Sequence, residues 1–163
     1  MTSVTLFNQI QVDQIRPQDL LPHRPPMLLI DRVIEYLPGV SVQAETFIKP
    51  DTMFFQGHFP GEPILPGVVL VEMMFQACGI FGRLEALNVV DVSSIQKDYR
   101  PRSGRAIKID NMTFNKPVLP NDTVRIRAVF DHRMLNFSVF KARVDIEGRG
   151  LAAKGIVTVL INA

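Results

Sequence analysis

Residues 67–87 read GVVLVEMMFQACGIFGRLEAL, and this stretch decides the fold. It contains no proline, and apolar side chains occupy most of its positions, which is typical of a helix that is buried on nearly every side. Pro66, directly before it, suits the first turn of a helix because the N–H that proline lacks would have no helical partner there. The sequence therefore predicts a long central helix enclosed by the rest of the chain.

Strand-like segments lie on both sides of this helix. Before it, residues 28–36 and 40–48 are rich in aliphatic side chains and are joined by the turn signal Pro38-Gly39. After it, clusters of turn residues separate four further strand-like segments: 106–114, 123–131, 135–146 and 151–161. This order predicts an α+β fold in which an antiparallel six-stranded sheet wraps around a long buried central helix, a hot-dog-like layout. No repeat or linker divides the chain, so we expect one domain over residues 1–163.

Composition narrows the class of protein. The formal net charge is only +2, so the dense basic face of a nucleic-acid-binding protein is not expected. The single cysteine, Cys78, cannot form an internal disulfide, and nothing indicates an oxidising compartment. The first residues lack the cationic start and apolar centre of a signal peptide, and polar residues and a proline interrupt the apolar run 64–80. We therefore expect a cytoplasmic protein with no membrane span.

The loop before the helix combines turn residues with large apolar side chains. Residues 49–66 hold four prolines and two glycines, which excludes regular structure, yet they also hold one methionine and three phenylalanines. Such a loop is expected to fold inward. His58 lies within it, between Gly57 and Gly61, and can approach the start of the helix.

Glu72 is the one acidic residue in the middle of the apolar helix. Burial among apolar side chains favours the neutral form of a carboxyl group. Gln76 lies one turn later on the same face and could hydrogen-bond it, although such a pair could also serve only to fix the helix in its packing. Together with His58 the pair has the pattern of a general base and a general acid. The backbone N–H of Gly67, at the helix start, could bind an anionic oxygen.

Several motifs in order carry a resemblance to a known family. They are LPHR (21–24), LLIDRV (28–33), FFQGHFPG (54–61), PILPG (63–67) and FNKPVLPND (114–122). Together they resemble the β-hydroxyacyl-acyl carrier protein dehydratases of fatty-acid synthesis, from about residue 15 to residue 127. The resemblance implies a hot-dog fold and a site with no metal and no organic cofactor. It also implies active sites shared across a homodimer, alone or within a trimer of dimers.

The resemblance also implies roles for particular residues. His58 matches the catalytic base, Glu72 the catalytic acid and Gly67 the backbone donor to the thioester carbonyl, with Gln76 and Phe59 in support. The implied reaction converts a β-hydroxyacyl-acyl carrier protein to the trans-2-enoyl product. Relatives that also isomerise the double bond typically carry Asp where this chain has Glu72, which favours the dehydratase-only branch.

Other polar residues are weaker candidates. Arg100, Arg102 and Arg105 form a basic cluster that could attract an acidic carrier protein, and an ordinary solvated loop is an equal alternative. Further basic candidates for the same role are Lys116 and Arg133. The two other histidines, His23 and His132, lie near turns, where structural or exposed positions are expected, although His23 belongs to a family motif and could brace the site.

Two other functions stay open. A hot-dog thioesterase would need an activated water rather than this His–Glu pair. A non-catalytic acyl-binding subunit would be expected to lack His58 or Glu72, and both are present. The three functions differ in their outcome with an enoyl thioester: reversible hydration, thiol release or neither.

Overall fold

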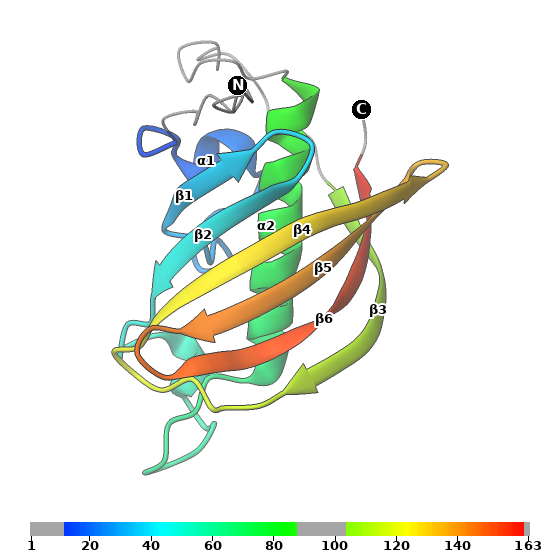
Figure 1. Ribbon diagram of the computed structural model, residues 1–163. Coiled ribbons are helices and arrows are strands. Elements are labelled where there is room, and N and C mark those ends of the chain that lie inside the picture. Colours follow the sequence, from blue (N-terminus) through cyan, green and yellow to red (C-terminus); the bar gives the residue numbers. More distant parts are fainter. Residues whose placement is uncertain (1–11, 88–103, 162–163) are drawn as a thin grey trace, which may run out of the picture.

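Six antiparallel strands curve around one long helix in the computed structural model, which describes residues 12–87 and 104–161 (Figure 1). The strands are β1 (Arg32–Leu37), β2 (Ser41–Phe47), β3 (Gly104–Phe114), β4 (Thr123–Met134), β5 (Phe137–Ile146) and β6 (Gly150–Ile161). Their order in the sheet is β1-β2-β4-β5-β6-β3, and each neighbouring pair is antiparallel. The predicted hot-dog layout is confirmed.

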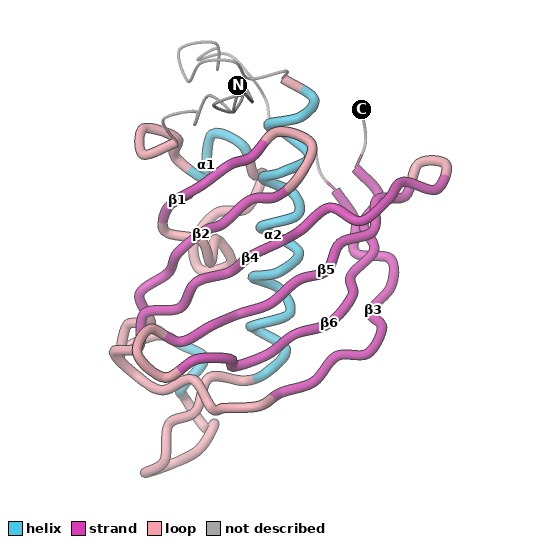
Figure 2. Tube along the Cα trace, viewed as in Figure 1, coloured by secondary structure: helices cyan, strands magenta, loops and turns pink. Residues whose placement is uncertain are grey.

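The long helix, α2 (Gly67–Ala86), lies along the concave face of the sheet, as the tube in Figure 2 also shows. Its side chains Met74, Ile80 and Leu84 are fully buried, as is Phe140 of β5. Burial of this kind is the main source of stability, at roughly 25 cal/mol for each Å² of apolar surface removed from water. Two short helical turns complete the described elements: α1 (Pro17–Leu20) and η1 (Met53–Phe55).

The first strand begins later than its composition predicted. Residues 28–36 were expected to form it, but β1 starts at Arg32. The backbone N–H of Leu29 donates instead to the side-chain oxygen of Gln76 on α2, at 2.9 Å. The backbone at Leu29 therefore contacts the helix instead of continuing the strand. The other five predicted strands are confirmed to within three residues at each end.

One side of α2 is open, so the prediction of a helix buried on nearly every side is wrong for that side. Val68 is 74% exposed, and Glu72, Phe75, Gly79 and Gly82 are partly exposed. Their spacing of three and four residues places these five on one face of the helix. We call this face the open stripe. It is open because the sheet of a single chain covers only the opposite side.

The inward-folding loop is confirmed only in part. Phe54 and Phe55 pack against the core, whereas Met53 and Phe59 are 51% and 50% exposed. The helix that follows, α2, is long and apolar enough to cross a bilayer, so the expectation that the interruptions in residues 64–80 exclude a span is wrong on length and composition. Sixty-seven per cent of its apolar window is buried inside the protein, as is usual for a core helix.

The end of α2 is attached to the turn between β1 and β2. A carboxylate oxygen of Glu85 accepts hydrogen bonds from the hydroxyl of Tyr36 and, at 2.7 Å, from the backbone N–H of Gly39. Gly39 has a φ of +70°, a conformation that side chains with a Cβ rarely adopt. The turn can therefore present its N–H to the helix because the residue is glycine.

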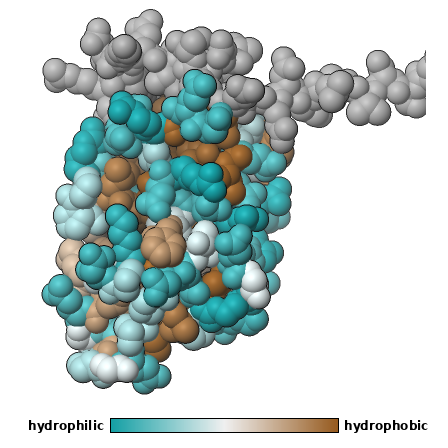
Figure 3. Space-filling view, turned by 90° about the vertical axis from the view of Figure 1, so that its left-hand side faces the viewer, coloured by the Kyte–Doolittle hydropathy of each residue, from teal (hydrophilic) through white to brown (hydrophobic). Residues whose placement is uncertain are grey.

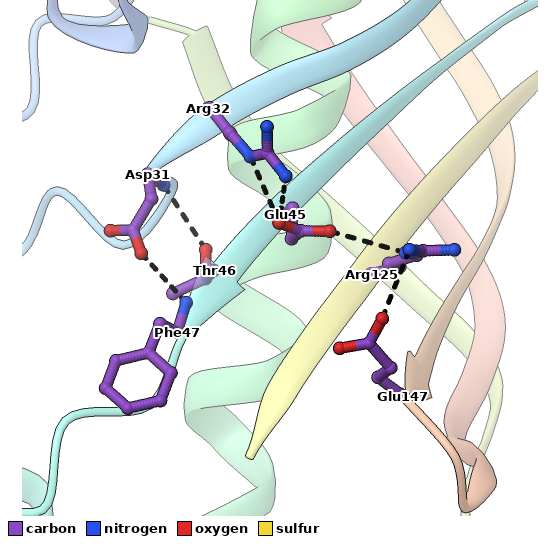
Figure 4. A network of polar contacts seen from close by, with 7 residues as sticks. All are labelled: Asp31, Arg32, Glu45, Thr46, Phe47, Arg125 and Glu147. Carbon is purple, nitrogen blue, oxygen red and sulfur yellow. Dashed lines mark hydrogen bonds and ion pairs between the residues drawn. The ribbon is translucent and has the colours of Figure 1, made fainter. Parts of the chain in front are cut away.

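A chain of polar contacts crosses the outer face of β1, β2 and β4 (Figure 4). Glu45 accepts hydrogen bonds from Arg32, at 2.6 and 3.0 Å, and from Arg125, at 3.4 Å. Arg125 also reaches Glu147 at 3.4 Å. The hydrogen bonds from Arg32 lower the pKa of Glu45, although partial burial opposes them. These contacts link neighbouring strands in the observed register.

Around the edge of the sheet next to β1, apolar patches are interspersed with polar residues on the side that Figure 3 shows. Asp31, just before β1, accepts a hydrogen bond from the backbone N–H of Phe47 at 2.8 Å, and its own N–H reaches the hydroxyl of Thr46 at 3.3 Å (Figure 4). Both contacts fasten the start of β1 to the end of β2.

We expect Glu45→Gln to lower the free energy of unfolding by about 1 kcal/mol at neutral pH, since partly exposed ion pairs contribute roughly 0.2–1 kcal/mol each. The folded-state pKa of Glu45 is depressed, so its stabilisation is present above the unfolded-state pKa and is lost as the pH falls through the folded-state pKa. Urea unfolding of both proteins over a series of pH values measures this. A difference that stays constant into acid would contradict the assignment.

Candidate active site

His58 is held in the loop before α2 by its neighbours. Its ring Nδ1 lies 2.8 Å from the carbonyl oxygen of Ile64, and its own carbonyl oxygen accepts from the N–H of Ile64 at 2.9 Å. A carbonyl oxygen can only accept, so the hydrogen is on Nδ1 and the lone pair on Nε2. The ring of Phe59 stacks on the imidazole with the two centroids 4.2 Å apart. His58 therefore presents Nε2 as a base.

A cavity of about 530 Å³ joins His58 to the start of α2. Ile64, Leu65, Gly67 and Phe114 line it together with His58. A Cβ on Gly67 would lie 2.7 Å from the Phe114 ring, so any side chain there would displace that ring. As the first residue of the helix, Gly67 has an N–H that no preceding helical carbonyl can accept. This N–H is suited to an oxygen bound in the cavity.

Glu72 lies on the open stripe, one turn beyond Val68. Its Oε1 accepts a hydrogen bond from Gln76 Nε2 at 2.9 Å and lies 3.3 Å from His23 Nε2. The predicted Gln76–Glu72 contact is confirmed. The Glu72 side chain is 30% exposed, so the expectation of a fully apolar surrounding is wrong for the single chain.

Gln76 fixes which oxygen of Glu72 can carry a proton. Gln76 is 1% exposed, and its Oε1 accepts from the N–H of Leu29 at 2.9 Å. Its Nε2 donates to the carbonyl oxygen of Met27 at 2.7 Å and to Glu72 Oε1. A flipped amide would lose all three hydrogen bonds, so Gln76 always donates to Glu72. When Glu72 is protonated, its proton is therefore on Oε2.

His23 is a residue whose position the turn-based reasoning did not predict. It contacts Glu72 through Nε2, and its Nδ1 is buried without a hydrogen-bond partner. The tautomer with hydrogen on Nε2 fits this arrangement, because it donates to the carboxyl oxygen. The LPHR motif was the only signal in the sequence that pointed to such a position. His132, by contrast, is exposed and pairs with Asp131 at 2.7 Å.

His58 and Glu72, the predicted base and acid, line different cavities. Glu72, His23 and Gln76 line a cavity of about 120 Å³, and no residue that lines it also lines the His58 cavity. The single chain therefore does not bring His58 and Glu72 together at one site.

The predicted docking residues are only partly visible. Arg100 and Arg102 lie outside the described residues, whereas Arg105 is exposed at the start of β3 and lines the Glu72 cavity. Lys116 lines the His58 cavity and donates to the carbonyl oxygen of Arg149. Arg133 is exposed near the tip of the β4–β5 hairpin. Within the described ranges, no three His, Cys, Asp or Glu side chains gather in a way that could hold a metal ion.

The sequence profile of the FabA-like domain family matches residues 21–153, well over half of the chain. The chain belongs to this family. A 3-hydroxyacyl-[acyl-carrier-protein] dehydratase, FabZ, of Pseudoalteromonas translucida is 37% identical over 143 residues, which cover 88% of each chain. The corresponding Geobacter metallireducens protein is 36% identical over 130 residues, covering 80% of this chain and 81% of its own length. The predicted family is confirmed.

A solved structure shares the fold of this FabA-like chain. It is described as the dehydratase heterocomplex ApeI:P from Xenorhabdus doucetiae, with a TM-score of 0.71 over 91% of this chain and 92% of the other. The two sequences are 19% identical. At this identity the likeness extends to the fold alone.

We expect Gln76→Leu to lower the free energy of unfolding by about 2–3 kcal/mol, because the buried N–H of Leu29 and the part-buried carbonyl of Met27 lose their partner at roughly 1–3 kcal/mol each. Urea unfolding measures the change. Gln56→Leu is the control, since Gln56 is exposed and a surface substitution is usually within about 0.5 kcal/mol. Equal stability of the two variants would show that the Gln76 amide does not bind these groups.

Proposed function

We propose that the protein removes water from a β-hydroxyacyl chain carried on acyl carrier protein and yields the trans-2-enoyl thioester. The observation that carries this proposal is the hydrogen-bonding state of the two reactive groups. His58 keeps Nε2 as a base because Nδ1 is bonded to Ile64, and Glu72 keeps Oε2 as an acid because Oε1 accepts from Gln76. The dehydratase names of the relatives point to the same chemistry.

The proposed reaction proceeds by proton transfers between the substrate, His58 and Glu72. His58 Nε2 takes the proton from the α-carbon, and the electron pair of that bond forms the double bond between the α- and β-carbons. The bond between the β-carbon and its hydroxyl oxygen breaks, and Glu72 gives its Oε2 proton to that oxygen, which leaves as water. Transfer of the proton from His58 back to Glu72 restores both groups.

The N–H of Gly67 donates to the thioester oxygen, where negative charge builds up as the α-proton leaves. A donor of this kind contributes on the order of 10²–10³-fold in rate, and general acid–base catalysis about 10²–10⁴-fold. Phe59 supports the base by stacking on the imidazole. Glu72 in the acid position further suggests dehydration without isomerisation of the double bond.

The proposal includes a homodimer in which each site takes His58 from one subunit and Glu72 from the other. Three observations support it. The two residues line separate cavities in one chain, and the open stripe leaves Val68 74% exposed. At the sheet edge, Ile107 and Ile109 of β3 are 47% and 49% exposed, so a second copy could cover an apolar surface there.

An acidic carrier protein would be attracted to a basic surface. Arg105, together with Arg100 and Arg102, would supply that surface. Lys116 lines the His58 cavity, and its positive charge would attract the same acidic carrier protein. A cytoplasmic location also belongs to the proposal, because an acyl carrier protein would have to be in the same compartment.

His58→Ala and Glu72→Gln should each reduce turnover of a β-hydroxyacyl-acyl carrier protein by about 10²-fold or more, given the rate gain expected from acid–base catalysis. Enoyl-thioester absorbance measures turnover, and circular dichroism checks the fold. Retention of more than about a tenth of the activity by either variant would remove that residue from the mechanism. Thiol release instead of a change in enoyl absorbance would indicate a thioesterase, and neither signal would indicate an acyl-binding subunit.

Mixing the two inactive variants should restore activity if the site is shared. A dimer with one His58→Ala and one Glu72→Gln subunit holds one site with both residues intact, so about half of the activity per mixed dimer is expected by two-fold symmetry. Native mass spectrometry follows subunit exchange, and each variant mixed with itself is the control. Confirmed exchange without any recovered activity would mean that each subunit uses its own pair.

A further inference from the structure

Three basic side chains form a row across the outer face of the sheet. Arg127 of β4, Arg143 of β5 and Lys154 of β6 are directly opposite one another in the strand register, and all three are exposed. We call them the basic row. The partners at its two ends, Gln43 of β2 and Thr113 of β3, are uncharged. Like charges directly opposite one another destabilise a sheet, so the basic row costs stability, and the proposed reaction does not use it.

Acidic side chains of the protein offset only part of this charge. Arg143 donates to both carboxylate oxygens of Asp145. Within residues 12–87 and 104–161, no acidic side chain forms an ion pair with Arg127 or Lys154. The other acids of β2, of β4 and of the turn after β5 pair with cations outside the row: Glu45 and Glu147 with Arg125, and Asp131 with Lys141. Two of the three cations are therefore available to an anionic partner.

A hollow of about 330 Å³ lies beside the basic row. Arg143 and Lys154 line it together with Lys141, and Val129 and Ile156 give it apolar side chains. The residues that alternate with Arg143 in β5 are buried, so the row points away from α2, on the side of the sheet that faces the viewer in Figure 1. The proposed homodimer would use the open stripe and the β3 edge, and this outer face would stay accessible.

The spacing of the basic row matches that of an α-helix. Neighbouring strands lie about 4.7–4.9 Å apart, so the row spans roughly 10 Å across three strands. One helical turn rises about 5.4 Å, so carboxylates on three successive turns of one helix face span a similar distance. A helix lying across the strands would bring one carboxylate to each cation. An apolar side chain between these carboxylates could enter the hollow.

We propose that the outer face of β4, β5 and β6 binds an acidic amphipathic helix of a partner protein, and that the basic row contacts its carboxylates. Opposite charges on the two surfaces would steer their encounter and set the direction of the helix across the strands. Bound carboxylates would also remove the repulsion that the free protein carries. This surface lies on the opposite side of the sheet from α2, so the inference does not depend on the proposed reaction.

The test measures binding of a fluorescein-labelled peptide by fluorescence anisotropy. The peptide has about 15 residues, is held helical by a lactam bridge because short helices are marginal in water, and carries glutamates on one face with leucines between them. A peptide of the same composition with its glutamates on all faces is the control probe. The wild-type protein should bind the first peptide at least about tenfold more tightly at low salt, and added salt should weaken this binding by screening.

Lys154→Glu should weaken binding of the one-faced peptide by at least about tenfold, because like charges then meet across the interface. Lys49→Glu is the matched control. Lys49 is also an exposed lysine, it lies after β2 and outside the basic row, and its substitution changes the net charge equally. It should change the dissociation constant by less than about twofold, since charges away from the contact are largely screened.

Stability gives a second readout that a purely structural role would not produce. Lys154→Glu places a carboxylate opposite Arg143, so the urea midpoint should rise, and the gain should shrink at high salt. Arg127→Glu should behave in the same way and replaces Lys154→Glu if that variant does not fold. A lower midpoint would mean that the basic row serves the fold. Equal binding of the two peptides, or tighter binding of phosphatidylserine vesicles than of the one-faced peptide, would overturn the helical partner.

Discussion

The side-chain amide of Gln76 holds three parts of the protein in one arrangement. Its oxygen binds the N–H of Leu29, and its nitrogen binds both the carbonyl of Met27 and the carboxyl group of Glu72. The segment before β1 is thereby attached to the middle of α2, and Glu72, the proposed acid, is oriented by the same group. A buried amide with every partner present is rigid, because each alternative leaves polar groups unpaired in the interior. The position of Glu72 depends on this satisfied network.

Periodicity and turn residues predicted most of the fold, because each strand and the helix bury a local pattern of apolar side chains. They misplaced the start of β1, since Leu28, Leu29 and Ile30 are suited to a strand, whereas the N–H of Leu29 donates to the distant Gln76. They also treated α2 as buried throughout. Composition shows that a side chain is apolar, but it does not show whether the same chain or another molecule covers that side chain.

For the candidate site, the sequence identified His58, Glu72 and the Glu72–Gln76 contact, because each stands out by residue type in an apolar context. Only the LPHR motif connected His23 to the site, and its turn position did not predict the contact with Glu72. His23 comes from a turn some fifty residues earlier in the chain. Such neighbours emerge only when the folded chain places distant segments around one cavity.

The attachment of Glu85 to the turn at Gly39 has a consequence for how the molecule opens. The carboxylate of Glu85, at the end of α2, accepts hydrogen bonds from Tyr36 and Gly39 of the β1–β2 hairpin. The helix end and the hairpin therefore cannot move apart without breaking these hydrogen bonds. Local opening should therefore involve both as one cooperative unit, and their backbone amides should exchange hydrogen for deuterium with similar protection. The hairpin, at the edge of the sheet, would in this way share the slow exchange of the central helix rather than fray as an independent edge.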